Sequence, residues 1–299
     1  MPARFSAYPS DAAALVRLLD DNETYRIGRA ADCELRIDHP SVSRFHAEMR
    51  RGTHGWRVDD TASKNGMRVE GHLVLNAEMS KATWFAIGDV YCWLEPLDAV
   101  AANAFREHGA TRRSVSRALS AQLMSSKGVG TLLPQTLDAV LELCGLERGF
   151  VLYGLPGEAL RIRANRGLGL EEIATTGFAG SAAAVDTALQ EGRTVVCCDT
   201  ADSPWLGARP SVRLGGIRAL VCVPLRLDDT PLGAIYADSH RPGPALTDLD
   251  LELIENVAQH AAAALAAARL ENELEQVLKA ASEAGIVAPR WDDVRRTRS

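Results

Sequence analysis

Three short clusters near the N-terminus combine residue types that suit the binding of a phosphate group. They are Gly28-Arg29, Ser43-Arg44-Phe45-His46 and Ser63-Lys64-Asn65-Gly66. A phosphothreonine brings nearly two negative charges and three strong acceptor oxygens, so its reader needs fixed cations and short hydroxyl or amide donors. Arginine can meet two oxygens at once, serine donates one short hydrogen bond, and asparagine can pair with a peptide main chain. The clusters therefore indicate a site for a phosphorylated peptide.

The segment around these clusters predicts a β-rich domain that could hold them together. From about Val16 to Leu97, short alternating apolar runs are broken by turn residues. Several strands at such close spacing are typical of a β-sandwich or barrel. Loops at one end of a sandwich can bring residues from all three clusters into one site.

In order and spacing, the three clusters resemble a forkhead-associated (FHA) domain. The run AIGDVYCWL is similar to the last hairpin of that family. The resemblance implies an all-β sandwich, over residues 1–98, that binds a phosphothreonine-bearing partner such as a Ser/Thr kinase or its substrate. The residues that it assigns to the phosphopeptide are Arg29, Ser43, Arg44, Lys64 and Asn65.

Other residues of the motif receive a structural role from the same resemblance. Gly28, His46 and Gly66 are architectural, and His46 braces the recognition loops instead of acting as a catalytic base. The family's usual threonine after Asn-Gly is Met67 here, which removes one hydroxyl. A sandwich that has lost its binding function stays open as an alternative.

A helical connector and a second domain follow. Residues 99–127 contain no proline and predict a helix; the Arg112-Arg113-Ser114-Val115 run within them is typical of a kinase site, although a solvated linker is the preferred interpretation. From Thr131 the apolar residues recur at helical spacing up to Gly145, which is placed to end a helix. Strand-like runs, an inserted helix and a hairpin at 228–231 then predict an α/β or α+β domain.

The second domain resembles a GAF domain, a fold with which regulators sense small molecules and signals. The resemblance covers residues 128–270 and rests on the runs LDAVLELCGLERGFVLY, ALQEGRTVVCCD, ALVCVPLRL, PLGAIYADS and TDLDLELIENVAQHAAAAL. These are scaffold motifs, so they indicate the fold and not the ligand. A pocket between the sheet and residues 200–216 is one hypothesis, with an unknown small molecule as ligand, and a packed dimerisation module is the other. The candidate wall residues are Trp205, Arg209, Arg213 and Arg218.

A long helix closes the second domain. Thr247 and Asp250 form a capping box in front of a helical pattern that runs to about Ala284, before Gly285 and Pro289. Beyond the domain, residues 271–299 are predicted to extend this helix and to end in a disordered tail. Apolar residues near the end of this helix recur at spacings of four, three and four, as in a coiled coil, and they predict a homodimer. A fraying, solvated helix end is the alternative. This seam consists of Leu270, Leu274, Val277 and Ala281.

Composition narrows the function further. A chain of 299 residues has room for two domains, and a net charge of −6 argues against nucleic acid as a direct partner. There is no long apolar run or secretory signal, which predicts a cytoplasmic protein without a membrane segment. The six cysteines have no metal-ligand spacing and are predicted to be buried and reduced, so we expect neither a metal nor a cofactor.

The sequence thus favours a signalling adaptor that is not an enzyme. The domain pair resembles the N-terminal half of bacterial enhancer-binding regulators, but the GxxxxGK[ST] run of an ATPase and a basic recognition helix are both missing. The predicted protein binds a phosphothreonine partner through its first domain, and it senses a ligand or dimerises through its second. Two alternatives remain: a GAF sensor gated by a small molecule, and a dimerisation scaffold whose FHA domain does not bind.

Overall fold

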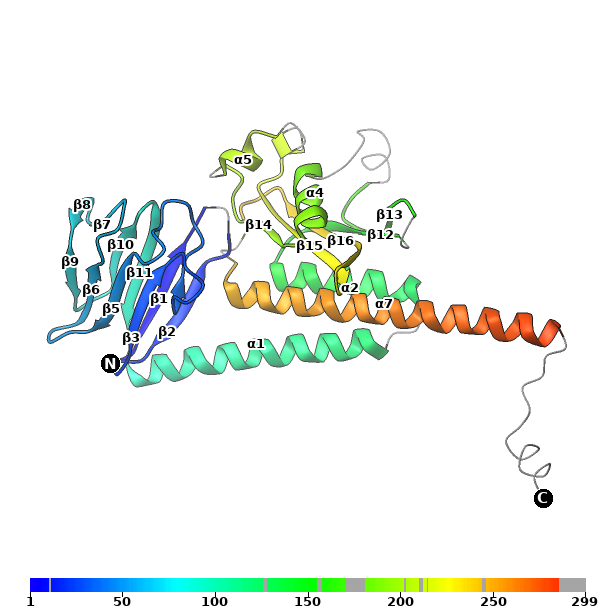
Figure 1. Ribbon diagram of the computed structural model, residues 1–299, viewed down its shortest axis with the longest axis horizontal. Coiled ribbons are helices and arrows are strands. Elements are labelled where there is room, and N and C mark those ends of the chain that lie inside the picture. The colour runs from blue at the N-terminus through cyan, green and yellow to red at the C-terminus, as the bar shows by residue number, and fades with distance from the viewer. Residues whose placement is uncertain are drawn as a thin grey trace, which may run out of the picture.

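The first domain is a sandwich of two β-sheets, described by a computed structural model (Figure 1). The six-stranded sheet has the order β2-β1-β11-β10-β7-β8, and the five-stranded sheet has the order β4-β3-β5-β6-β9. The strands of the larger sheet are β1 (Ala3–Tyr8), β2 (Leu15–Leu19), β7 (Met67–Val69), β8 (His72–Val74), β10 (Thr83–Ile87) and β11 (Val90–Pro96). Those of the smaller sheet are β3 (Thr24–Gly28), β4 (Leu35–Arg36), β5 (Ala47–Arg51), β6 (Trp56–Asp60) and β9 (Asn76–Met79).

The structure describes residues 1–10, 12–125, 128–154, 158–169, 181–201, 203–209, 212–213, 215–243 and 246–284, with the backbone alone at 124–125 and 204–205. The predicted stop at Gly285 and Pro289, the predicted disordered tail and the side chain of Trp205 therefore lie outside the described residues.

Alternation of side chains along the strands builds the sandwich core. On β1, Ala3, Phe5 and Ala7 are fully buried, and they meet Met49 and Trp56 of the opposite sheet in one apolar cluster. β1 was not expected from the sequence, because the alternating pattern was recognised only from Val16 onward. It nevertheless lies inside the larger sheet, between β2 and β11.

The second domain is an antiparallel sheet in the order β13-β12-β16-β15-β14 with helices on both faces. Its strands are β12 (Arg148–Tyr153), β13 (Arg161–Arg166), β14 (Val195–Cys197), β15 (Ala219–Leu227) and β16 (Thr230–Ser239). The helices are α1 (Ala99–Ser125), α2 (Val129–Cys144), α4 (Ala182–Glu191), α5 (Pro204–Gly207) and α7 (Asp248–Glu283). Figure 1 shows α2 and α7 on one side of the sheet, α4 on the other, and α1 alongside α7.

Neighbouring residues of β16 divide this domain into two apolar clusters. Ile235 and Ala237 face the cluster formed with α2 and α7, whereas Ala234 and Tyr236 face the cluster formed with α4. Because successive strand residues point to opposite faces, a strand buried on both sides must be apolar throughout, as this one nearly is.

The predicted end of α2, the predicted start of α7 and the predicted hairpin are all present. Gly145 adopts a left-handed conformation (φ 63°) and donates its N–H to the Leu141 carbonyl, which ends α2. Thr247 and Asp250 form the predicted capping box of α7 through reciprocal hydrogen bonds. The predicted hairpin joins β15 to β16, with Asp228 at φ 51° in its turn.

The connecting helix α1 packs on α7 with one face, whereas Arg113, Ser114 and Val115 of the run interpreted as a solvated linker are exposed. Arg112 forms an ion pair with Asp250 at the start of α7, and Arg113 lies 3.9 Å from Glu252. Ser116 is buried and donates to the Leu253 carbonyl at 3.4 Å. α1 is therefore held to α7 around residues 112–120, while Arg106 nearer its start pairs with Asp20 of the first domain.

The two domains touch where the β1–β2 connection meets the start of α7. Ala14 donates its N–H to the Leu246 carbonyl at 2.7 Å and accepts from the N–H of Asp248 at 2.9 Å. The Asp248 carboxylate accepts from the N–H of Val16 at 3.0 Å and from the guanidinium of Arg17. This short bridge joins the edge of the sandwich to the first turn of the last helix.

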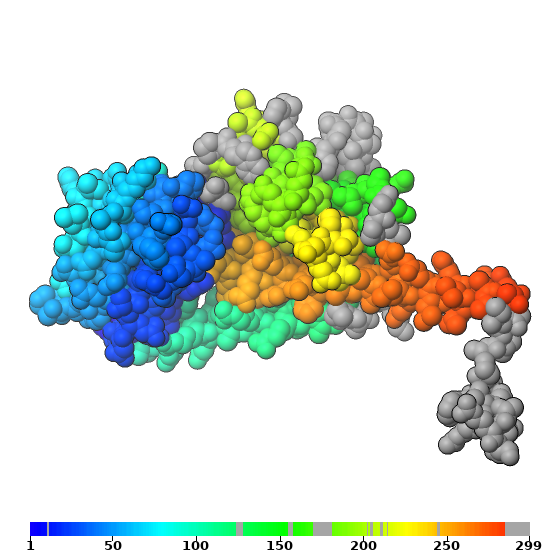
Figure 2. All heavy atoms as spheres, in the orientation of Figure 1, coloured from blue at the N-terminus to red at the C-terminus, as the bar shows by residue number. Residues whose placement is uncertain are grey.

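The far end of α7 projects beyond both domains, as the orange and red atoms of Figure 2 show. Leu270, Leu274 and Val277 of the predicted seam are each at least 59% exposed, and Leu278 beside them is 57% exposed. In the described residues no other element covers this apolar stripe.

The cysteines are free, as predicted, and Cys198 alone among them is half-buried rather than buried. Within the described part of the chain, the side chains that could ligate a metal form no cluster of three. The helices described there are also too short or too polar to cross a bilayer.

Candidate functional site

The three motif clusters lie together at one end of the sandwich. Arg29 follows β3, Ser43 lies in the connection between β4 and β5, and Lys64 lies between β6 and β7. Backbone hydrogen bonds tie the first two segments, because the Arg29 N–H donates to the Ser43 carbonyl at 2.9 Å. The Lys64 N–H donates to the Ser43 hydroxyl at 3.0 Å and draws the third segment to the same point. We call these three connections the recognition loops.

A buried histidine holds the recognition loops from below. The His46 ring is fully buried, its Nδ1 accepts from the Ser43 N–H at 3.0 Å, and its Nε2 lies 3.1 Å from the Gly66 carbonyl oxygen. Since Nδ1 is an acceptor, the ring proton is on Nε2 and is donated to Gly66. Burial lowers the pKa of His46 below its ordinary value of 6.5, which favours this neutral form.

An aspartate that was not singled out from the sequence supports the same network. The Asp60 carboxylate accepts from the Ser63 hydroxyl at 2.6 Å and N–H at 2.9 Å, and it lies 3.8 Å from His46 Nε2. Ser63 in turn accepts from the Gly66 N–H at 3.0 Å. An aspartate three residues before a serine is a turn-forming pattern, so the DTAS run carried a usable signal.

The arrangement of serine, histidine and aspartate does not form a nucleophilic triad. His46 bonds the backbone N–H of Ser43, whereas the Ser43 hydroxyl accepts from Lys64. A triad requires the histidine to take the proton of the serine hydroxyl. Here that hydroxyl proton stays available for an acceptor in front of the loops.

The cations of the site are exposed and face outward. Arg29, Arg44 and Lys64 are exposed, and no ion pair between described residues involves any of them. Arg29 uses only its Nε within the protein, at 3.4 Å from the Val42 carbonyl oxygen. Its two terminal nitrogens are thus left for a doubly charged oxyanion, and the Ser43 hydroxyl lies on the adjoining loop.

Glycine 28 allows the first loop to approach the second. A Cβ at this position would lie 2.1 Å from the Arg44 carbonyl oxygen, so a larger residue would push the two loops apart.

Asn65, assigned to the ligand backbone, also donates from Nδ2 to the Ser41 carbonyl at 2.7 Å. Its side chain therefore fixes the loops as well as facing the solvent.

Two further residues qualify what was expected from the motif. Phe45 stands between Arg44 and His46 and is 49% exposed, which adds an apolar surface to the site. Met67, where the family has a threonine, is fully buried at the start of β7 and faces the core. Its side chain is therefore part of the sandwich packing.

The candidate wall residues of the second domain are only partly brought together. Arg213 and Arg218 line an open hollow of about 600 Å³, with Thr200, Ser203 and Gly207. Arg218 makes two hydrogen bonds to Asp199, at 3.0 and 2.7 Å, and its guanidinium holds the pKa of that carboxyl below the usual range.

Arg209 does not line this hollow; its carbonyl accepts from the N–H of Arg213 at 3.0 Å. Trp205 contributes its backbone to α5, and its side chain is outside the described residues. Of the four candidate residues, Arg213 and Arg218 therefore line the hollow, and the guanidinium of Arg218 is engaged by the Asp199 carboxylate.

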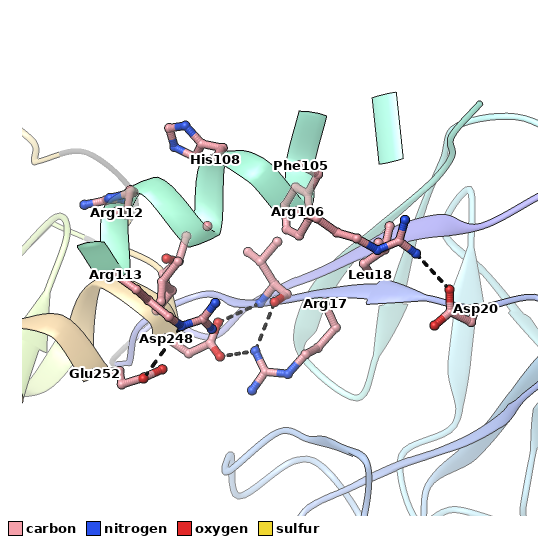
Figure 3. A pocket seen from close by; sticks show the side chains of 14 residues that line it. Arg17, Leu18, Asp20, Phe105, Arg106, His108, Arg112, Arg113, Asp248 and Glu252 are labelled. Carbon is pink, nitrogen blue, oxygen red and sulfur yellow. Dashed lines mark hydrogen bonds and ion pairs between the residues drawn. The ribbon is translucent and has the colours of Figure 1, made fainter. Parts of the chain in front are cut away.

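A larger hollow of about 630 Å³ lies between the domains, where β2, α1 and α7 meet (Figure 3). Figure 3 shows Arg17 directed to Asp248, Arg106 to Asp20, and Arg113 to Glu252. Because each of these arginines meets a carboxylate, the hollow is lined by internal ion pairs. Its chemistry joins the domains and offers little free charge to a ligand.

Comparisons with known proteins agree with this geometry. The family model described as "FHA domain" matches residues 25–89, and that described as "GAF domain" matches residues 129–265. A relative from Corynebacterium jeikeium (strain K411), "Oxoglutarate dehydrogenase inhibitor", is 33% identical over 96 residues, which cover 29% of this chain and 67% of the relative.

Solved structures similar to each part are also found. The FHA domain of the CT664 protein from Chlamydia trachomatis is 27% identical, with a TM-score of 0.28, and the match covers 32% of this chain and 99% of that one. The GAF domain of the cyanobacteriochrome TePixJ is 16% identical, with a TM-score of 0.40, and the match covers 50% of this chain and 95% of that one. An all-β sandwich and a helix-flanked sheet, in the order found by both family models, establish that this chain belongs to the FHA family and carries a GAF domain behind its FHA domain.

Proposed function

We propose that this chain is a signalling adaptor whose FHA domain binds a phosphothreonine-bearing partner through Arg29, Ser43, Arg44, Lys64 and Asn65. The observation that carries the proposal is the convergence of three exposed cations and a serine hydroxyl with its proton still to donate, on loops held by the buried His46. Exposed cations with no carboxylate partner favour an incoming anion, and the donor set fits a phosphate. FHA and GAF domains are regulatory binding domains, and the matched relative is named as an inhibitor.

In the proposed complex each residue has a distinct task. The terminal nitrogens of Arg29 meet two phosphate oxygens, and the Ser43 hydroxyl donates to the third while it still accepts from Lys64. Arg44 and Lys64 add positive charge at the sides, and Asn65 pairs with the peptide main chain. His46 stays neutral and keeps Ser43 and Gly66 at a fixed separation.

The test is the binding of a degenerate phosphothreonine peptide library to the full chain at fixed salt. We expect phosphate-dependent binding that falls about 100-fold or more in Arg29→Ala, because that change removes two charge-assisted hydrogen bonds. Arg50→Ala is the matched control, since Arg50 is an exposed arginine of the same domain on β5. Unphosphorylated and phosphoserine libraries establish the dependence on phosphothreonine. Equal binding by wild type and Arg29→Ala would overturn the proposal.

A homodimer through the far end of α7 is a second element of the proposal. It is supported by the exposed stripe of Leu270, Leu274 and Val277, whose spacing suits a short coiled-coil seam. Sedimentation of the full chain is expected to give a dimer that becomes monomeric when residues 270–284 are removed. A wild-type monomer at high micromolar concentration would rule this part out and leave binding by the FHA domain untouched.

The GAF domain is assigned a sensing role only as an alternative. The hollow lined by Arg213 and Arg218 supports it weakly, because Asp199 already occupies the Arg218 guanidinium. A metabolite screen by thermal shift would detect a ligand through the rise in melting temperature that mass action requires.

A further inference from the structure

The outer face of the larger FHA sheet carries a cluster of four aromatic side chains. Tyr8 lies opposite Tyr91 in the β1–β11 pairing, and Trp84 lies opposite Trp93 in the β10–β11 pairing. Residues directly opposite each other share a face, and residues two apart on one strand do so too. All four side chains therefore lie on the same face, away from the buried Phe5, Phe85 and Cys92. We call this surface the aromatic patch.

The aromatic patch is packed within itself but open to solvent. The rings of Trp84 and Trp93 have centroids 4.9 Å apart, and those of Tyr8 and Trp84 are 5.7 Å apart. Tyr91 is 67% exposed, Trp84 52% and Tyr8 37%. In a chain with only 5% aromatic residues, such a concentration on a solvent-facing sheet surface is unexpected, because that face of an antiparallel sheet is normally polar. Exposed aromatic patches of this kind are typical of interaction surfaces.

The β10–β11 turn connects the patch to the recognition loops. Gly88 in this turn donates its N–H to the Gly66 carbonyl at 3.1 Å, and Asp89 donates its N–H to the Ser41 hydroxyl at 2.9 Å. Arg68 pairs with Ala86 across the sheet and donates to the Gly88 carbonyl at 3.2 Å. The turn is thus fixed to the same segments that hold the phosphate-binding residues, and the patch begins directly behind it.

The dimensions of the patch suit one extended peptide. Tyr91 follows Asp89 by two residues and Trp93 by four, so the patch reaches about 14 Å from the turn at about 3.4 Å per residue. Strands β1, β11 and β10 span about 10 Å at their usual spacing, which is close to the width of a single extended chain with its side chains. Four to six peptide residues at about 3.3 Å each would cover this length.

We propose that the aromatic patch binds the apolar flank of the phosphothreonine segment that the recognition loops capture, an inference that rests on the proposed function of those loops. The phosphothreonine would supply phosphate-dependent affinity at Arg29. Leucine, proline or aromatic residues in one flank, beyond the positions next to the phosphothreonine, would pack on Trp84 and Tyr91. This second contact makes the protein selective for long segments with an apolar flank.

The experiment selects phosphothreonine peptides with twelve randomised residues on each side of the phosphothreonine, using the full chain. Three proteins are compared: wild type, the double variant Trp84→Ser/Tyr91→Ser, and Leu75→Ser as a matched control. Leu75 is 77% exposed on the same domain, outside the patch. The enriched apolar peptide and its version truncated to four residues on each side are then titrated, with tryptophan fluorescence as a direct readout of Trp84 and Trp93.

We expect wild type and Leu75→Ser to enrich apolar residues at the distant positions of one flank, and the double variant to enrich only the positions next to the phosphothreonine. The long peptide should bind the double variant about 10-fold more weakly than wild type, whereas the truncated peptide should bind both equally. Tryptophan emission should shift with the long peptide alone.

Distant enrichment that is equal in all three proteins, or absent from all three, would overturn the assignment of the patch while leaving the phosphothreonine site in place. Absence of any phosphate-dependent selection would overturn the proposed function and this inference with it. Wild-type self-association that the double variant loses would show instead that the patch is an interface between two copies of the chain, which also overturns the proposal.

Discussion

Both domains contain a buried polar network, but among the described residues the FHA network lies beneath unpaired surface cations, whereas the GAF network pairs its charges internally. Beneath the recognition loops, His46 is bonded to Ser43 and Gly66, and exposed cations follow immediately above. In the GAF domain, Arg148 is 12% exposed and forms an ion pair with the fully buried Asp238. Beside it, the Tyr236 hydroxyl accepts from the Ser181 N–H at 3.1 Å at the start of α4.

On the proposed function, the FHA network serves binding, whereas the GAF network serves packing. In the FHA domain the buried groups are the neutral His46, backbone atoms and the Asp60 carboxylate, which accepts from Ser63. Among the described residues no carboxylate pairs with Arg29, Arg44 or Lys64. In the GAF domain the charged partners neutralise each other, as Arg218 and Asp199 do nearer the surface. A gathering of arginines is thus informative about ligands only after their carboxylate partners have been located.

The largest effect is expected when the GAF network is broken from one side. Arg148→Ala leaves the Asp238 carboxylate buried without its cation, so the free energy of unfolding should fall by about 3–5 kcal/mol. Urea denaturation of the full chain measures this. Arg166→Ala, which breaks an exposed pair with Asp138, is the control and should cost about 1 kcal/mol or less. A loss below 1 kcal/mol for Arg148→Ala would show that the buried pair contributes no more to folding than an exposed pair does.

A smaller loss of stability, joined to a loss of binding, is expected from His46→Ala. The change leaves the Ser43 N–H and the Gly66 carbonyl without their partner and opens a cavity, which should destabilise the FHA domain by about 2–3 kcal/mol. Phosphopeptide affinity should fall as well, because the loops lose their brace. His54→Ala, at an exposed histidine of the same domain, should change neither quantity. Unchanged peptide affinity in a destabilised His46→Ala would show that His46 supports folding but is not needed for binding.

The same histidine makes the stability of the FHA domain depend on pH. The pKa of His46 is lower in the folded chain than its ordinary value of 6.5, so the unfolded chain binds the proton more readily. The contribution of His46 to stability is therefore complete above about pH 6.5 and is lost as the pH falls below it, by at most about 1.4 kcal/mol per pH unit. Denaturation at several pH values should show this slope in wild type and a reduced slope in His46→Ala. Equal slopes would assign the effect to other groups.

The smallest effect is expected at the surface of the GAF hollow. Asp199→Asn weakens a pair whose arginine is 43% exposed, so the free energy of unfolding should change by about 1 kcal/mol or less. Thermal denaturation with and without inorganic phosphate checks whether the hollow binds an anion once the Asp199 charge is removed. A phosphate-dependent rise in melting temperature in the variant would mean that the Asp199 carboxylate is what keeps an anion out of this hollow.

The sequence was sufficient for the elements that carry local signals. The capping box at Thr247, the helix end at Gly145 and the order of the three motif clusters all depend on residues close in the chain. β1 was missed because only Phe5 and Tyr8 stand out in its alternating pattern, and its place in the sheet depends on pairing with β11. Asp60 was also missed: its bonds to Ser63 follow a local pattern, but its approach to His46 depends on the pairing of β5 with β6.

The same limit applies to charge. From the sequence, Arg218 was a candidate ligand-binding arginine and Arg112 was part of a run interpreted as a solvated linker, yet each meets a carboxylate that is distant in the chain. Ion pairing depends on the tertiary arrangement, so residue type and spacing could nominate these arginines but could not tell which charges remain free.

The pairing of β1 with β11 has a consequence for the order in which the chain is assembled during synthesis. Residues 3–8 pair with residues 91–96, so the larger sheet of the FHA domain stays incomplete until its last strand has left the ribosome. Ala14 can form its hydrogen bonds only after Leu246 and Asp248 have been synthesised, long after the sandwich can close. The FHA domain can therefore mature first, with its β1–β2 edge open, and the bridge to α7 forms only when the GAF domain is nearly complete.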